Sequence, residues 1–112
     1  MVYLKGKIKS IKSWIKMLNN KYKIILVNII EKHLPKSKIY LFGSRAQGSY
    51  IRSSDIDIAL DNKEIVSTNI LGKIKDEIEE SIIPYSVDVV DLHNVDHKMK
   101  NQILKHGVLW KS

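Results

Sequence analysis

The first thirty residues carry apolar side chains at alternating steps of four and three positions, which is the spacing of one face of an α-helix. Lysines mostly occupy the positions between them. Asn19-Asn20 is a weak helix breaker, so we predict one helix near residues 4–18 and a second near 20–34, ended by Pro35. The apolar positions of the stripe are Leu4, Ile8, Ile11, Ile15, Leu18, Tyr22, Ile25 and Ile29.

Beyond residue 38 the pattern changes to short strands that alternate with helices. A buried strand over 39–42 stops at Gly43-Ser44, and the alternation of apolar residues with Asp55, Asp57 and Ala59 predicts a strand over 56–60. Apolar residues at helical spacing predict a helix over 63–82, which Pro84 separates from a third strand near 86–90. A last helix, capped by Asn94 and ended by Gly107, precedes a short strand over 108–110.

These elements predict a two-layer α+β fold, in which a layer of helices packs on a small sheet of three or four strands. A chain of 112 residues fits a single domain. We divide it into an N-terminal helical segment over 1–34 and a catalytic core over 38–110. The order of helices and strands does not by itself settle the strand directions.

The composition narrows the class of protein further. The chain has no cysteine, which excludes disulfides and thiolate metal sites and agrees with a cytoplasmic location. No apolar run approaches the roughly 20 residues of a membrane span, and we expect a mature protein without a secretory signal. The net charge of +7 lies entirely in residues 1–30, which hold seven lysines and no acid. This lysine-rich face is either solvated or a contact surface for an acidic partner or nucleic acid.

The segment from Gly43 to Asp57 has the composition of a phosphate and metal site. Gly43 at the end of a strand lets the backbone approach a ligand closely, the residues after it can open a helix that attracts phosphate, and Ser44 adds a hydroxyl donor. Asp55 and Asp57 are two apart on a strand, so their side chains project from the same face. Such a pair can bracket two hard cations of the kind used in phosphoryl chemistry.

A third carboxylate is expected from the strand near 86–90. Asp88 lies between two valines that face the other way, and an acid inside a β-branched strand needs a compensating partner. Asp91 is the rival, but it falls on the opposite face from Asp88. The chain's two arginines, Arg45 and Arg52, both lie between the Gly-Ser turn and the Asp pair, where their forked guanidinium groups suit triphosphate oxygens.

These residues resemble the signature of the DNA polymerase β-type nucleotidyltransferase superfamily, in which a Gly-Ser pair is followed some ten residues later by Asp-x-Asp. Here ten residues, 45–54, separate Ser44 from Asp55, and the small chain is similar to the minimal nucleotidyltransferases, or MNT proteins. The resemblance implies a mixed, partly antiparallel sheet backed by helices. It also implies that Gly43 and Ser44 hold the triphosphate of ATP. Asp55 and Asp57 would bind Mg²⁺, two ions in all, and Asp88 would complete the metal site and help to activate the acceptor hydroxyl.

The resemblance further implies a partner. Minimal nucleotidyltransferases are commonly paired with a small helical HEPN protein, and in several pairs the enzyme is an antitoxin that transfers AMP to a tyrosine of the toxin. We therefore expect an Mg²⁺-dependent adenylyltransferase that acts on a protein hydroxyl, within an oligomer or hetero-oligomer. The alternative is a non-catalytic nucleotide-binding module that neutralises a helical partner by binding. Templated polymerisation is not favoured, since no residues remain for a domain that grips nucleic acid.

Several other residues invite a functional interpretation that the sequence does not favour. His93 and His97 are four apart, but His93 precedes the last predicted helix and no third zinc ligand is apparent. We expect His33 and His106 to act as cations or surface groups near helix ends. Trp14 and Trp110 are expected to pack against the core or a partner.

Overall fold

The computed structural model describes residues 11–48 and 55–112, with side chains described from residue 20 onward in the first of these ranges. The elements follow in the order α1 (Ile11–His33), β1 (Lys38–Phe42), α2 (Gly43–Gln47), β2 (Ile56–Asp61), α3 (Thr68–Glu79), β3 (Val87–Asp91), α4 (His97–His106) and β4 (Val108–Lys111). All the strands predicted from the sequence are present, within one or two residues of their predicted bounds.

The sheet is mixed and partly antiparallel, as the resemblance implied. Its strand order is β3-β2-β1-β4, with β1 antiparallel to both of its neighbours and β3 parallel to β2. The parallel pair needs a crossover, which α3 supplies. Strands β3 and β4 therefore lie at the two edges of the sheet among the described residues.

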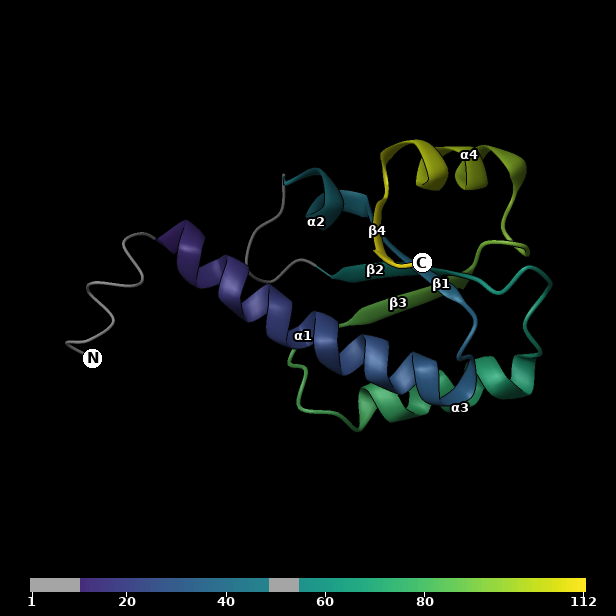
Figure 1. Ribbon diagram of the computed structural model, residues 1–112, viewed down its shortest axis with the longest axis horizontal. Coiled ribbons are helices and arrows are strands. Elements are labelled where there is room, and N and C mark those ends of the chain that lie inside the picture. The colour runs from purple at the N-terminus through teal and green to yellow at the C-terminus, as the bar shows by residue number, and fades with distance from the viewer. Residues whose placement is uncertain (1–10, 49–54) are drawn as a thin grey trace.

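Helices cover both faces of this sheet (Figure 1). The long helix α1 and helix α3 lie side by side on one face, whereas α2 and α4 lie on the other. The structure thus adds a second, smaller helical layer to the predicted arrangement.

The larger hydrophobic core fills the space between the sheet and helices α1 and α3. Period-two alternation directs every second residue of β2 into this core, and the helical stripe of α1 meets it. The smaller core lies under α4 and contains Ala59, Leu92 and Ile103. The main members of the larger core are Leu26, Ile30, Leu34, Ile39, Ile56, Ile58, Leu60, Val66, Ile74, Ile78, Ile83 and Val89.

The prediction of two N-terminal helices divided at Asn19-Asn20 was wrong, because one helix runs from Ile11 to His33 through both asparagines. Asparagine is only a moderate helix former and lacks the severe penalties of glycine and proline. The apolar stripe also continues in phase across the pair in the sequence. Beyond the pair, Tyr22, Ile25 and Ile29 pack against the larger core. The part of the first predicted helix that precedes residue 11 lies outside the described residues.

Two helix starts also differ from the prediction. Helix α3 begins at Thr68, where the Ser67 side chain accepts a hydrogen bond from the Ile70 amide, and not at Lys63, whose φ of 69° is incompatible with a right-handed helix. Helix α4 is capped by Asp96, which accepts from the Met99 amide, and not by Asn94. Ser67 and Asp96 are both short polar residues of the kind that cap helices, and other residues of this kind lie close to them in the sequence.

No helix within residues 11–48 and 55–112 is long and apolar enough to cross a membrane.

Candidate active site

The turn from β1 into α2 brings Gly43 directly against Asp57 on the neighbouring strand. Phe42 and Asp57 are partners in the antiparallel register, so the chain leaves β1 beside the Asp57 side chain. Gly43 has φ +74°, and a Cβ atom at this position would lie 2.4 Å from Oδ2 of Asp57. Any other residue would therefore be strained and would collide with the carboxylate. The approach of this backbone to a ligand stays a prediction, and the described neighbour of Gly43 is Asp57.

Asp57 and Asp88 are direct neighbours across the parallel pair of strands. They are partners in the register of β2 and β3, and both occupy the face opposite the larger core. Asp57 is half-buried, whereas Asp88 and Asp55 are exposed. Asp55 precedes the first residue of β2 and lies two positions from Asp57. The structure thus brings the third predicted carboxylate beside the Asp-x-Asp pair.

The pKa of Asp57 shows that these carboxylates share one electrostatic neighbourhood. Burial raises this pKa above its ordinary value, and the negative charges of Asp88 and then Asp55 raise it further. The guanidinium group of Arg45 opposes them and lowers it. A cation placed among the three carboxylates would relieve the repulsion.

The side chain of Arg45 is nearly buried beside the carboxylates, and Tyr85 covers it. Only 9% of Arg45 is exposed, and its guanidinium carbon lies 4.7 Å from the centre of the Tyr85 ring. Tyr85 in turn meets Tyr22 of α1 edge-on, with ring centres 5.5 Å apart. Tyr85 could not be predicted as a site residue from the sequence, since its position after Pro84 belongs to no periodic pattern. Its contact with Arg45 arises only because the loop before β3 folds beside α2.

Of the two remaining predicted site residues, Ser44 and Arg52, only Ser44 is among the described residues. Ser44 is half-buried in the first turn of α2, directly after Gly43. Arg52 lies outside the described residues. A hollow of about 170 Å³ opens beside Gly43, between α2 and α4, and includes Met99 and Gln102 in its lining.

Asp91, the rival third carboxylate, is used by the fold. It is 5% exposed, and its two oxygens accept hydrogen bonds from the Val66 amide at 2.7 Å and the His93 amide at 3.0 Å. It fastens the loop before α3 to the end of β3. The prediction that it faces away from Asp88 is confirmed, since Val89 on its face belongs to the larger core.

Two of the histidines, His33 and His93, form contacts with carboxylates that hold elements of the fold together. Nε2 of His93 lies 2.6 Å from Oδ1 of Asp61. Burial, the largest single influence, raises the pKa of Asp61, but the hydrogen bonds from His93 and the Lys63 amide and the charges of His93 and Lys38 together outweigh it, so the pKa is lowered. His33 similarly contacts Glu77 across α1 and α3, at 2.6 Å. His106 is exposed at the end of α4.

The described tryptophan also packs as expected. Trp110 is partly buried against the larger core, and the Lys23 ammonium group lies 6.0 Å from its ring centre. The side chain of Trp14 is outside the described set.

The chemistry of the carboxylates suits a hard divalent cation such as Mg²⁺, which prefers oxygen ligands. Among the side chains described in 20–48 and 55–112, however, no three His, Cys, Asp or Glu groups are arranged to hold a metal ion. Burial and then the charges of Asp88 and Asp55 raise the pKa of Asp57, and a cation beside these carboxylates would reduce their mutual repulsion. The donor set therefore fits the ion, while the coordination itself stays a prediction.

Comparison with known proteins identifies the class that this fold and site define. The family model of the polymerase beta nucleotidyltransferases matches residues 23–112, and the chain belongs to that family of enzymes. The match begins within α1 and includes Gly43, Asp57 and Asp88, so the site described above lies inside it.

Individual relatives give a narrower likeness. The chain is 33% identical over 87 residues to the protein adenylyltransferase MntA of Shewanella oneidensis, which covers 76% of this chain and 62% of that protein. It is 27% identical over 81 residues to a probable protein adenylyltransferase MntA of Haemophilus influenzae, with 72% and 71% covered. It also resembles a chain from a crystal structure of a toxin–antitoxin with AMP-PNP, with a TM-score of 0.64, 29% identity and coverage of 81% and 72%.

Proposed function

We propose that the chain transfers AMP from ATP to a hydroxyl group of a partner protein, with Mg²⁺ as the cofactor. The observation that carries the proposal is the contact between Gly43 and Asp57, which places a glycine turn able to admit phosphate directly against a carboxylate that is paired in register with Asp88. The relatives named as protein adenylyltransferases support the choice of a protein as acceptor. The likeness to a structure that contains AMP-PNP supports ATP as donor.

Each residue has a role in this proposal that follows from its place. The backbone at Gly43 and the hydroxyl of Ser44 bind the triphosphate, at the glycine turn that ends β1. Arg45 supplies positive charge beside the carboxylates, and Arg52 is assigned to the triphosphate as well. Asp55, Asp57 and Asp88 hold Mg²⁺, which when bound neutralises charge on the transferring phosphoryl group.

The reaction is an in-line displacement at the α-phosphorus. The acceptor oxygen forms a bond to this phosphorus, the bond to the bridging oxygen breaks, and pyrophosphate leaves. Asp88, which β3 contributes to the carboxylate set, is exposed and is assigned to accept the proton of the acceptor hydroxyl. Asp57 is held beside Gly43 and orients the phosphoryl end of the site.

The partner proposed for this reaction is a small helical protein of the HEPN type, modified on a tyrosine and thereby neutralised as a toxin. The support is the likeness, at 29% identity, to a chain from a solved toxin–antitoxin structure, together with the MntA relatives. The chain spans 62% of the Shewanella relative, and the proposal concerns the catalytic region that the two share.

Mass spectrometry tests the proposal directly. The chain is mixed with ATP, Mg²⁺ and the candidate HEPN protein, and the partner is expected to gain one or more AMP units. Omission of Mg²⁺ tests whether the transfer requires the metal ion. Replacement of ATP by GTP tests the preference for the nucleotide base. An active HEPN protein that is neutralised without any gain in mass would instead support the alternative of a non-catalytic binding module.

A further inference from the structure

Strand β3 has an open edge beside the carboxylate site. Its only neighbour among the described strands is β2. The Ile56 amide donates to the Ser86 carbonyl at 2.9 Å, and the Leu92 amide donates to the Leu60 carbonyl at 2.9 Å. In a parallel ladder these two bonds mean that the even-numbered residues of β3 bond to β2. The N–H and C=O groups of Val87 and Val89 therefore point outward.

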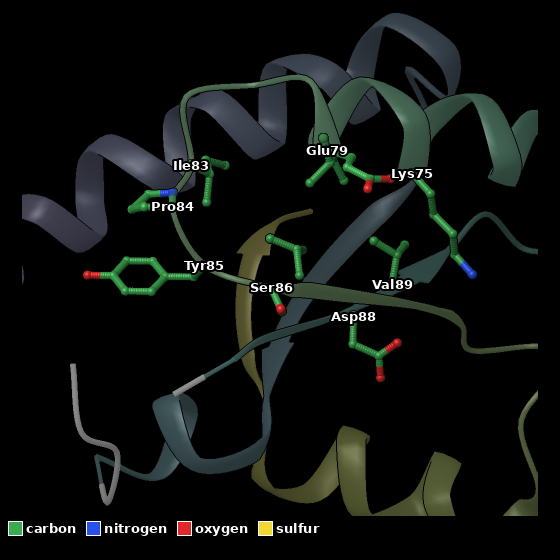
Figure 2. A pocket seen from close by; sticks show the side chains of 10 residues that line it. Lys75, Glu79, Ile83, Pro84, Tyr85, Ser86, Asp88 and Val89 are labelled. Atoms are coloured by element: carbon green, nitrogen blue, oxygen red, sulfur yellow. The ribbon is translucent and has the colours of Figure 1, made fainter. Parts of the chain in front are cut away.

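A groove of about 490 Å³ follows this edge between α3 and β3. Figure 2 shows Lys75 and Glu79 projecting from α3 on one side of it, with Pro84 and Tyr85 at one end. Ile78 and Ile83 line it with apolar surface and are nearly buried. Its volume falls in the range of pockets that hold ligand side chains. Asp88, the carboxylate that β3 contributes to the site, also belongs to the lining of the groove.

We propose that an extended segment of the acceptor protein docks along β3 as an additional strand and thereby places its hydroxyl residue beside Asp88; this inference rests on the proposed function. An open edge is complementary to an extended backbone because each outward N–H and C=O requires a partner of the same kind. The five residues of β3 would pair with a segment of about five residues.

Strand geometry then determines which side chains of the segment face the site. A residue directly opposite Asp88 shares its face of the sheet, so its side chain lies beside the carboxylates. The residues immediately before and after it face α3, where Ile78 and Ile83 offer apolar contact. The acceptor is therefore a tyrosine, serine or threonine flanked on both sides by apolar residues.

Hydrogen exchange measured on the intact chain tests the docking without any chemistry. The probe is an acetylated peptide of about nine residues with a central tyrosine between two valines, and its matched control carries phenylalanine in place of the tyrosine. Either peptide should slow exchange of the Val87 and Val89 amides about tenfold. The Asp88 and Val90 amides already bond to β2 and should change little.

The outcomes separate the two proposals. Protection of Val87 and Val89 without AMP transfer to the tyrosine peptide would support docking at the edge and contradict the proposed function. Transfer of AMP with unchanged exchange at both amides would overturn the docking proposal and leave the proposed function intact. Unchanged exchange without AMP transfer would also overturn the docking proposal.

A variant of the edge provides the second test. V87P removes an outward N–H from an edge strand, a position where proline leaves the ladder to β2 complete. It should raise KM for the tyrosine peptide about tenfold, with kcat and ATP-induced thermal stabilisation unchanged. V87T keeps the N–H and the branched side chain and should match the parent protein. If V87P lowers Tm sharply, the hydrogen exchange result on the parent decides the question; equal KM in a folded V87P variant would overturn the proposal.

Discussion

The two faces of the central sheet are built from the same strands but have different compositions and roles. On the face covered by α1 and α3, residues such as Ile56, Ile58 and Leu60 are at most 3% exposed and form the larger core. The opposite face holds Asp57, and its own core under α4 is much smaller. One strand can therefore stabilise the fold with one set of residues and supply charged groups with the residues between them. Substitutions on the two faces should consequently have separable effects.

The largest expected effect is the loss of activity in D57N. Asparagine removes the charge with little change in volume, so AMP transfer should fall at least about a thousandfold, or roughly 4 kcal/mol in transition-state free energy. The melting temperature should stay the same or rise, since repulsion from Asp88 and Asp55 is removed. Transfer is measured by mass gain on the acceptor and stability by thermal unfolding. Retention of full activity would remove Asp57 from the catalytic site.

Its neighbour on the other face should show the reverse. I58A deletes a fully buried side chain in the larger core and should lower the free energy of unfolding by about 2 to 5 kcal/mol. Activity per folded molecule should be preserved below the melting transition, because Ile58 faces away from the carboxylates. Denaturant titration gives the stability. A loss of kcat that exceeds the loss of folded protein would show that the two faces are coupled.

A smaller effect is expected where the glycine turn meets the carboxylate face. G43A introduces a Cβ at 2.4 Å from Oδ2 of Asp57 and at a strained φ, and it should cost about 1 to 3 kcal/mol of stability together with most of the activity. G48A is the matched control, since Gly48 has φ +75° and, apart from its chain neighbours, no heavy atom of the described residues lies within 4 Å of its Cβ position. Equal losses of activity in the two variants would attribute the effect to backbone strain alone.

The smallest expected effect is the pH dependence of the difference in Tm between D57N and the parent protein. Because folding raises the pKa of Asp57, its protonated form favours the folded state. Its contribution to stability is complete below the ordinary value of 3.8 and is lost as pH rises through the folded-state pKa. The difference in Tm between D57N and the parent protein should therefore be small at about pH 3 and grow in favour of D57N toward neutrality. A difference that shrinks over this interval would contradict the raised pKa.

Features that arise from local backbone geometry were predictable from the residue pattern alone. A period of two places alternate residues on opposite faces of any strand, so the separation of Asp57 from Ile56 and Ile58 was predictable. The glycine at the end of the first strand likewise indicated a close backbone approach, and the observed φ of +74° agrees. The same alternation correctly separated Asp88 from Asp91.

Only the tertiary structure decided which of these elements are neighbours. The register that pairs Asp57 with Asp88 depends on the parallel placement of β3 next to β2, which no local pattern specifies. The contact of Tyr85 with Arg45 and the open edge of β3 depend on the same strand order. The unbroken helix through Asn19-Asn20 is a further case, because asparagine disfavours a helix only slightly and the residues that follow the pair pack against the larger core. Local periodicity fixes the direction of a side chain, whereas burial of the whole core selects its neighbours.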